Sequence, residues 1–243
     1  MSGQVVLVTG ASSGIGLATT RAFVEAGHAV VALARNQAVL GELERVWGEE
    51  RLFAIAADLR EPAQLEQAFG AVAERWGGVD VLVNNAGLAH DAPLLTGDAA
   101  LWRDVLEVNV LGLAVCTRLA VAQMRGRGDR GTVIHVSSMS GHRVPPGGAM
   151  YAASKHAVRA LTEGLRQELR AVDSGIRVCC VSPGGVLTDF QVRKHGAERA
   201  AEIHAEHTQL APDDIARIIC FLADSPDHVE IHDVLVRPTP QPR

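Results

Sequence analysis

Tyr151 and Lys155 are separated by one helical turn in the segment YAASK. At this spacing two side chains share one face of a helix, so that an ammonium group can stand beside a phenol. A phenol has an ordinary pKa near ~10, and a neighbouring positive charge favours the phenolate and lowers that pKa. Lowering it to ~7 requires about 4 kcal/mol of differential stabilisation. The pair predicts an acid/base group, which would work near neutral pH if Lys155 and a second positive charge close to the phenol together supply this stabilisation. Tyr151 is the single tyrosine of the chain.

A glycine-rich turn, TGASSGIG, follows the apolar run VVLV at the start of the chain. Its glycines, Gly10, Gly14 and Gly16, let the backbone approach a pyrophosphate, and the helix that follows offers free N–H groups and the positive end of its dipole. The turn lacks the lysine of a P-loop, and its spacing departs from GxGxxG. A nucleotide phosphate site is predicted here, with a purely structural turn as the alternative.

The chain resembles the short-chain dehydrogenase/reductase family, because TGxxxGIG, NNAG, VSSMSG, YxxxK and a Pro-Gly turn occur in that family's order. The resemblance extends from about Val5 to Pro238. It implies a hydride transfer between a nicotinamide and a carbonyl or alcohol, in which Tyr151 is the acid/base and Ser138 holds the reacting oxygen. It also implies that an amide at Asn109 holds a backbone carbonyl or water in a proton path that ends at Lys155. The catalytic residues implied are Asn109, Ser138, Tyr151 and Lys155.

The end of the second predicted strand indicates which dinucleotide is bound. The family typically places an acidic residue there to hold the ribose of NAD, whereas this chain has Ala34 followed by Arg35. A planar guanidinium can pair with a 2′-phosphate, so we predict NADP(H) rather than NAD(H) as the cofactor; a surface arginine is the alternative. The cofactor-binding residues implied are Gly10, Ser12, Ser13, Gly14, Ile15, Gly16, Arg35, Asp58, Leu59, Asn85, Ala86, Gly87, Tyr151, Lys155, Pro183, Gly184, Val186 and Thr188.

The sequence identifies the substrate less precisely than it identifies the cofactor. SMSGHRV, ALTEGLRQELR and RPT are similar to an NADP-dependent branch that includes 3-ketosteroid and farnesol reductases, and APDDIARII with SPDHVEI resembles bacterial 3-hydroxy acid dehydrogenases. Arg143 or Lys194 could hold a substrate carboxylate, or each could be a solvated surface cation. A lid is expected over Gln191 to Gln209. The substrate-binding residues expected are Ser140, His142, Arg143 and Gly185.

Two other functions were compared with carbonyl reduction. One is the NADP-linked oxidation of a 3-hydroxy acid, which would use the same site in reverse. The other is a dinucleotide-sensing protein without catalysis, which would keep the glycine turn but would not need Ser138, Tyr151 and Lys155 together. Because all three are present, an enzyme is the better prediction.

Alternating strands and helices must position these residues. Near-continuous apolar runs start at Val5, Ala29, Leu52, Val79, Thr132 and Ile176, and a further strand is expected after Ile231. Helical spacing occurs over 16–26, 38–47, 62–76, 101–124, 151–172 and 212–223. Such alternation predicts a single-domain, doubly wound α/β fold over residues 1–243, with a tail at 237–243 and ligands at the carboxyl ends of the strands.

Charge and composition exclude several partners. A net charge of -5 and no cluster of basic residues argue against nucleic acid. No apolar stretch was expected to reach the ~18 residues of a membrane span, so a cytoplasmic protein is predicted. His204 and His207 are spaced like metal ligands but have no third partner, and no metal is predicted. The long helices 101–124 and 151–172 predict a homodimer or homotetramer.

Overall fold

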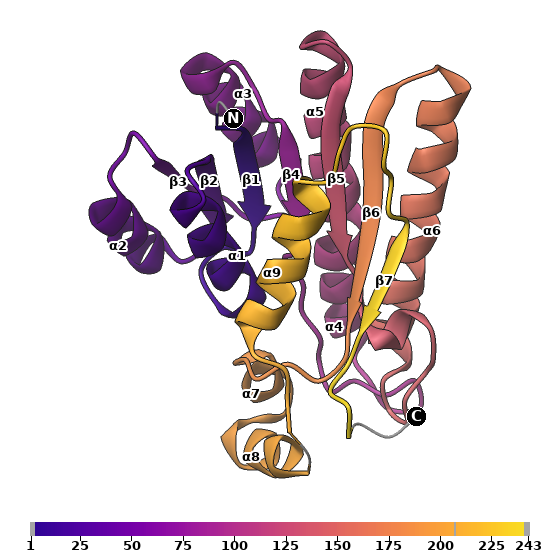
Figure 1. The fold of residues 1–243 in the computed structure, drawn as a ribbon. Helices are drawn as coiled ribbons and strands as arrows, with labels where there is room; N and C mark the ends of the chain where they lie inside the picture. The colour runs from indigo at the N-terminus through magenta and orange to yellow at the C-terminus, as the bar shows by residue number, and fades with distance from the viewer. Residues whose placement is uncertain (1–2, 207, 241–243) are drawn as a thin grey trace.

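One parallel sheet forms the centre of the computed structural model, which describes residues 3–206 and 208–240. The order of its seven strands is β3-β2-β1-β4-β5-β6-β7, and each pair of neighbours is parallel (Figure 1). The chain order reverses between β1 and β4, which opens a crevice at the carboxyl ends of the strands. The strands are β1 (Val5–Thr9), β2 (Ala29–Ala34), β3 (Leu52–Ala56), β4 (Val81–Asn84), β5 (Arg130–Val136), β6 (Gly175–Pro183) and β7 (Asp233–Val236).

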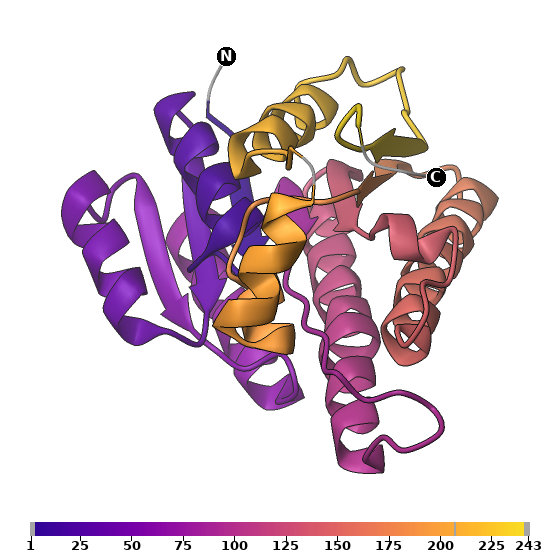
Figure 2. The same cartoon turned by 90° about the horizontal axis from the view of Figure 1, so that it is seen from below.

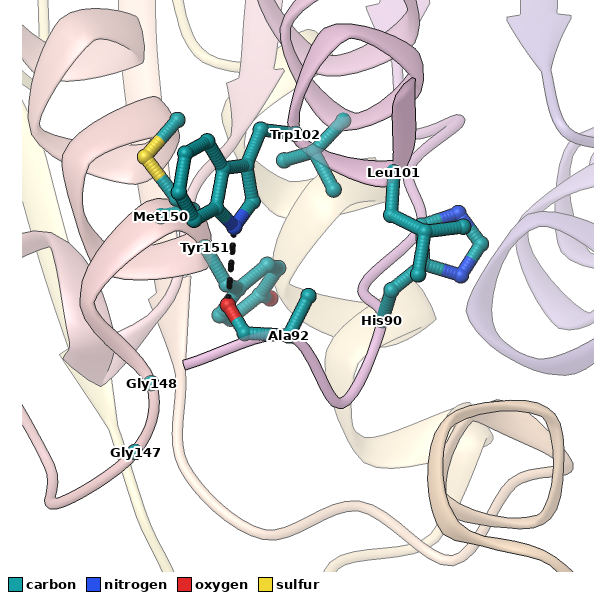
Figure 3. A pocket seen from close by; sticks show the side chains of 9 residues that line it. His90, Ala92, Leu101, Trp102, Gly147, Gly148, Met150 and Tyr151 are labelled. Atoms are coloured by element: carbon teal, nitrogen blue, oxygen red, sulfur yellow. Dashed lines mark hydrogen bonds between the residues drawn. The ribbon is translucent and has the colours of Figure 1, made fainter. Parts of the chain in front are cut away.

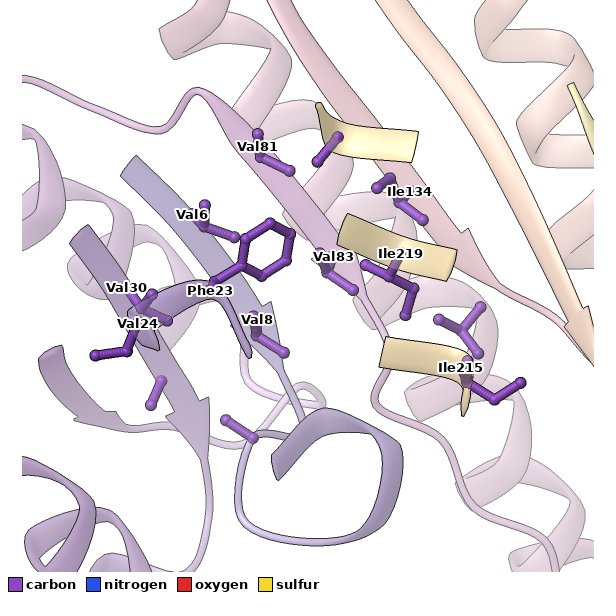
Figure 4. Close-up of a cluster of buried hydrophobic side chains, with 14 of the residues drawn as sticks. Val6, Val8, Phe23, Val24, Val30, Val81, Val83, Ile134, Ile215 and Ile219 are labelled. Atoms are coloured by element: carbon purple, nitrogen blue, oxygen red, sulfur yellow. The ribbon is translucent and has the colours of Figure 1, made fainter. Parts of the chain in front are cut away.

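Helices cover both faces of the sheet. One apolar core joins α1, α2 and α9 to one face, and a second joins α3, α5 and α6 to the other. Figure 4 shows the first core, where Phe23, Ile215 and Ile219 meet Val6, Val8 and Val83. The helices are α1 (Gly14–Glu25), α2 (Gln37–Trp47), α3 (Pro62–Trp76), α4 (Ala99–Leu106), α5 (Leu113–Gly126), α6 (Ala149–Ala171), α7 (Phe190–His195), α8 (Ala197–Ala205) and α9 (Pro212–Ala223), with a 3₁₀ turn, η2 (Met139–Gly141).

The continuous valine and isoleucine runs explain the two-faced burial. In β1, all five residues are buried, because helices cover the sheet on each side. The fold expected from the sequence is therefore confirmed, and the strand after Ile231 is present as β7. The last residues of the predicted tail, 241–243, lie outside the described residues.

The helix predicted over 101–124 consists of three segments. A π-helical segment, η1 (Glu107–Gly112), separates α4 from α5. A π segment inserts one extra residue into a helical turn and is frequent at functional sites. Gly112 lies in this segment where a side chain would contact Leu59: a Cβ atom there would come within 2.7 Å of the Leu59 backbone oxygen.

The same helical stretch corrects one expectation about membranes. Ala99–Gly126 is long and apolar enough to cross a bilayer by length and composition, although no such stretch was expected. Cys116, Ala120 and Met124 on this stretch are fully buried against the sheet. The apolar side chains of this stretch thus pack in the core of the fold. A cytoplasmic location remains a proposal.

A buried histidine lies within the core behind the site. The ring nitrogens of His135 lie 2.9 Å from Thr162 Oγ1 and 3.0 Å from Thr117 Oγ1. Burial, together with the positive charges of Lys155 and Arg166, lowers the pKa of His135 to about 3. The ring is therefore neutral in the folded protein throughout the physiological range.

Acid is expected to destabilise the protein through His135. Its folded pKa of about 3 lies below the unfolded value of 6.5, so the unfolded chain binds more protons between these two pH values. The free energy of unfolding should fall as pH falls through this window, by up to about 1.4 kcal/mol per pH unit from this residue. His135→Gln removes the titration, and urea unfolding from pH 6.5 to 4.5 should give a shallower slope than in the wild type. Equal slopes in the two proteins would contradict this account.

Candidate active site

A cavity of about 970 Å³ lies at the carboxyl ends of the strands, between the glycine-rich turn and the helices α7 and α8, which fall within the segment expected to form a lid. It brings together segments that are far apart in the chain: the ends of β1 to β6, the first turns of α6, and α7 and α8 (Figure 2). The predicted residues that line it are Gly10, Ser12, Ser13, Gly14, Ile15, Arg35, Asp58, Leu59, Asn85, Ala86, Gly87, Ser138, Ser140, Arg143, Tyr151, Lys155, Pro183, Gly184, Gly185, Val186 and Thr188. Gly16, Asn109 and His142 are not among its lining residues.

The glycine-rich turn has a backbone that other residues would not readily adopt. Gly10 and Gly14 have φ values of +69° and +52°, in the left-handed region that favours glycine. Asn85 braces the turn, since its Nδ2 donates to the carbonyl oxygen of Thr9 at 3.0 Å. Gly16 lies behind the turn, where a Cβ would come within 2.2 Å of the Gly10 oxygen. Gly16 therefore permits the turn to form without touching the cavity itself.

Charged side chains gather at the ends of β2 and β3. Ala34 is buried, and Arg35 is exposed at the cavity with Nη1 3.9 Å from Asp58 Oδ2. Asp58 is held by Arg60, whose Nε donates to Asp58 Oδ1 at 3.0 Å and whose side chain lowers the pKa of that carboxyl. Because Arg60 already neutralises Asp58, Arg35 retains a positive charge for a ligand. No carboxylate occupies position 34, where one would repel a 2′-phosphate.

Ser138, Tyr151 and Lys155 meet where β5 ends and α6 begins. The Ser138 hydroxyl acts on the Tyr151 phenol in the direction that lowers its pKa, and both side chains line the cavity. Lys155 Nζ lies 5.9 Å from the centre of the Tyr151 ring and donates to the Val136 carbonyl oxygen at 2.9 Å. A Cβ at Gly87 would lie 3.4 Å from Lys155 Nζ, so the absence of a side chain there keeps the ammonium close to the cavity.

Burial sets the pKa values of Tyr151 and Lys155 in the ligand-free protein. In the protein without a ligand, burial raises the pKa of Tyr151 to about 12, and the Ser138 hydroxyl only partly opposes this effect. Burial lowers the pKa of Lys155 to about 8. Desolvation of the phenol therefore dominates in the ligand-free protein. The sequence-based expectation relied on the charge of Lys155 together with that of a bound nicotinamide, so it stays a prediction for the cofactor complex. Lowering the pKa of Tyr151 requires a further positive charge in the cavity.

Asn109 occupies the π segment η1 rather than a regular α-helix. Its Oδ1 accepts from the Leu88 backbone N–H at 2.8 Å, and its Nδ2 donates to the Leu88 carbonyl at 2.9 Å and to Ser154 Oγ at 3.0 Å. The amide thus fixes the backbone that follows NNAG. This agrees with the carbonyl-holding part of the expected role, while Asn109 itself stands behind the cavity wall.

The predicted substrate residues separate into two groups. Ser140, Arg143 and Gly185 line the cavity, but His142 does not, because its Nε2 lies 3.0 Å from Ser182 Oγ beside β7. The structure therefore gives His142 a structural contact in place of the expected substrate contact. His204 belongs to α8, and His207 lies outside the described residues. No group of three or more potential metal ligands occurs in the described part of the chain.

A histidine and an aspartate form a further part of the cavity wall. His90 Nε2 lies 2.7 Å from Asp104 Oδ2, and Asp104 also binds Arg60. Figure 3 shows His90 beside a pocket of about 10 Å³ that extends to Tyr151, with Trp102 Nε1 donating to the Ala92 carbonyl at 2.9 Å. Asp104 and Arg193 were not predicted as site residues. In the sequence, Asp104 and Arg193 look like ordinary surface charges. Only the folding of the chain brings these two side chains to the cavity.

Fold and site together define an α/β nucleotide-binding protein with a serine, tyrosine and lysine at the mouth of its sheet. Comparison with known proteins agrees with this class. Residues 4–199 match the family described as short chain dehydrogenase. The chain belongs to this family and is an oxidoreductase, as its sequence had indicated.

Relatives and solved structures cover almost the whole chain. Human dehydrogenase/reductase SDR family member 11 is 41% identical over 98% of this chain and 95% of its own length. A farnesol dehydrogenase of Aedes aegypti is 38% identical over 98% of this chain and 96% of its own. A solved structure, the closed form of serine dehydrogenase complexed with NADP+, has a TM-score of 0.93 and 32% identity, covering 98% of this chain and 96% of that one.

Proposed function

We propose that this enzyme transfers a hydride between NADP(H) and a small carbonyl compound or secondary alcohol, with Ser138, Tyr151, Lys155 and Asn109 forming the site. The observation that carries the proposal is that Ser138, Tyr151 and Lys155 line the same dinucleotide-sized cavity. The NADP+ bound by the serine dehydrogenase supports the cofactor, as do Ala34 and Arg35 at the end of β2. The left-handed glycines at 10 and 14 provide the close approach that a pyrophosphate needs.

When bound, NADP(H) supplies or accepts the hydride, and the protein handles the proton. The Ser138 hydroxyl donates to the substrate oxygen and holds it beside Tyr151 Oη. Tyr151 gives its proton to that oxygen during reduction and takes one from the hydroxyl during oxidation. Lys155, with a pKa of about 8, can exchange a proton near neutral pH and favours the phenolate by its charge. Asn109 keeps the Leu88 backbone in place beside Lys155.

A hydroxy acid is a second candidate substrate. Lys194 of α7 and Arg143 after η2 both line the cavity, so a substrate carboxylate could be paired with a cation there. Serine dehydrogenase, by its name, acts on a molecule with a carboxylate, whereas the farnesol dehydrogenase is named for an apolar alcohol. An assay of NADPH consumption with 3-oxo acids and with uncharged aldehydes and ketones separates these two substrates.

Replacement of Arg35 tests the cofactor assignment. Arg35→Gln should lower kcat/KM for NADPH by about 30-fold, since a charge-assisted pair with the 2′-phosphate is lost, and should leave kcat/KM for NADH within about twofold. Steady-state kinetics with both cofactors and one substrate provide the measurement. The exposed Arg217→Gln on α9, which pairs with Asp214, is the control. A wild type that prefers NADH would refute the assignment.

We also propose that copies of the chain associate. Leu101, Leu106 and Leu111 of the α4–η1–α5 stretch are exposed large apolar side chains, and Val172 at the end of α6 is another. Exposed apolar side chains grouped on long helices favour contact with another copy. Light scattering of the purified protein would show a dimer or tetramer on this proposal.

A further inference from the structure

The lid contacts both walls of the cavity. The Phe190 ring of α7 lies 5.5 Å from the Tyr151 ring on one side. Farther along α7, His195 Nδ1 lies 3.9 Å from Asp91 Oδ2 on the loop after β4. Arg193 reaches the opposite wall, where Nη1 donates to Ser13 Oγ at 3.4 Å. The six residues of α7 therefore bridge the glycine-rich turn and the substrate side of the cavity.

Among the described residues of the lid, Arg193 is a cation that no carboxylate pairs with. Asp91 attracts both Lys194 and His195, and Arg199 is paired with Glu202 at 2.6 Å. Among the described residues, no carboxylate lies within 4.0 Å of the Arg193 guanidinium, and a serine hydroxyl is its hydrogen-bond acceptor. A guanidinium has five N–H donors, of which a single hydroxyl satisfies one. The arrangement leaves the charge of Arg193 available to an anion in the cavity.

The position of Arg193 indicates which anion this is. Ser13 precedes Gly14 in the turn that opens α1, and a Cβ at Gly14 would lie 3.0 Å from Thr188 Cγ2 just before the lid. Arg193 therefore lies above the part of the cavity where the backbone allows the closest approach of a phosphate. Arg35, at the end of β2, stands at a different part of the lining and serves the 2′-phosphate.

We propose that Arg193 binds the pyrophosphate of the dinucleotide from the lid side, so that bound cofactor ties α7 to the glycine-rich turn. This inference rests on the proposed function, since it requires that NADP(H) occupies the cavity. A planar guanidinium can form two charge-assisted hydrogen bonds to phosphate oxygens, which are stronger than its single bond to Ser13. Bound cofactor then holds α7 against the glycine-rich turn before the substrate enters.

The test is the dissociation constant of each reduced cofactor, measured by fluorescence without substrate. Arg193→Gln should raise the dissociation constants of NADPH and NADH by the same factor, about tenfold, because both carry the pyrophosphate. Arg193→Lys should recover part of the lost affinity, since lysine keeps the positive charge but lacks the planar guanidinium that can donate two parallel hydrogen bonds. Arg199→Gln, on the same lid, should stay within about twofold of the wild type. NADPH should also protect the 190–206 segment from proteolysis in the wild type more than in Arg193→Gln.

Three outcomes would overturn the inference. The first is an unchanged dissociation constant in Arg193→Gln, and the second is a loss of affinity for NADPH alone, which would assign Arg193 to the 2′-phosphate. The third is an equal loss in Arg199→Gln, which would indicate a general effect of lid charge. Failure of the wild type to bind NADPH at all would instead refute the proposed function. Wild-type binding with an unaffected Arg193→Gln variant refutes the role of Arg193 alone.

Discussion

Tyr151→Phe is expected to lower kcat about a thousandfold, because the proton donor and acceptor at the substrate oxygen is removed. The fold should persist, since the ring that packs 5.5 Å from Phe190 is retained. NADPH should bind within about threefold of its wild-type affinity, because the glycine-rich turn and Arg35 are unchanged. Activity within a few-fold of the wild type would end the acid/base assignment. A variant that also failed to bind NADPH would point to a collapsed cavity, which near-ultraviolet circular dichroism would reveal.

The single tyrosine gives this prediction a direct spectroscopic readout. Phenolate absorbance reports Tyr151 alone, because the chain has one tyrosine. Without cofactor, native protein should show no ionisation up to about pH 10.5, since burial raises the pKa of Tyr151 to about 12. The chain unfolded in urea should ionise near pH ~10. Saturating NADP+ should lower the native value, because its cationic ring adds the positive charge that Lys155 does not provide alone.

Gly16→Ala is expected to abolish measurable NADPH binding and to lower the free energy of unfolding by about 3 kcal/mol. The added Cβ would lie 2.2 Å from the Gly10 oxygen and 2.4 Å from Asn85 Nδ2. The first of these atoms belongs to the backbone, so the glycine-rich turn must move and its phosphate site with it. Urea unfolding and NADPH fluorescence measure the two effects.

Gly41→Ala is the matched control for this substitution. Gly41 lies in the exposed part of α2, and a Cβ there meets nothing within 4 Å. Alanine is the better helix former, so this variant should be more stable by about 0.5 kcal/mol and should bind NADPH normally. If Gly16→Ala behaved like Gly41→Ala, the packing of helix α1 on the turn would not depend on a glycine at that position.

The sequence predicts the sheet correctly, and most of the residues that it predicts for the site line one cavity, for physical reasons. Continuous apolar runs such as AVVALA indicate strands that are buried on both faces of a parallel sheet. The turns that follow such strands meet at the carboxyl edge of the sheet, so their residues come together there. Spacing of one helical turn placed Tyr151 and Lys155 on one face of α6, as expected. These features depend on local periodicity, which a sequence displays directly.

Other properties of the site depend on contacts between distant segments. His142 is close in sequence to Ser138, yet the path of the chain after η2 turns it toward Ser182. The pKa of Tyr151 depends on how deeply the phenol is enclosed, which spacing alone does not reveal. Arg193 reaches Ser13 across 180 residues of sequence, and no periodic pattern signals that meeting.

The π segment at 107–112 has a consequence for how this enzyme can vary in evolution. One residue of α-helix corresponds to a rotation of about 100°, so the extra residue sets the phase of α4 independently of α5. Insertions and deletions in surface loops have little effect on stability. A deletion within the π segment would instead rotate α4 and move Asp104 away from His90, while the buried residues of α5 kept their contacts with the sheet. The π segment thus fixes the rotation of α4, which carries Asp104, relative to the buried helix α5.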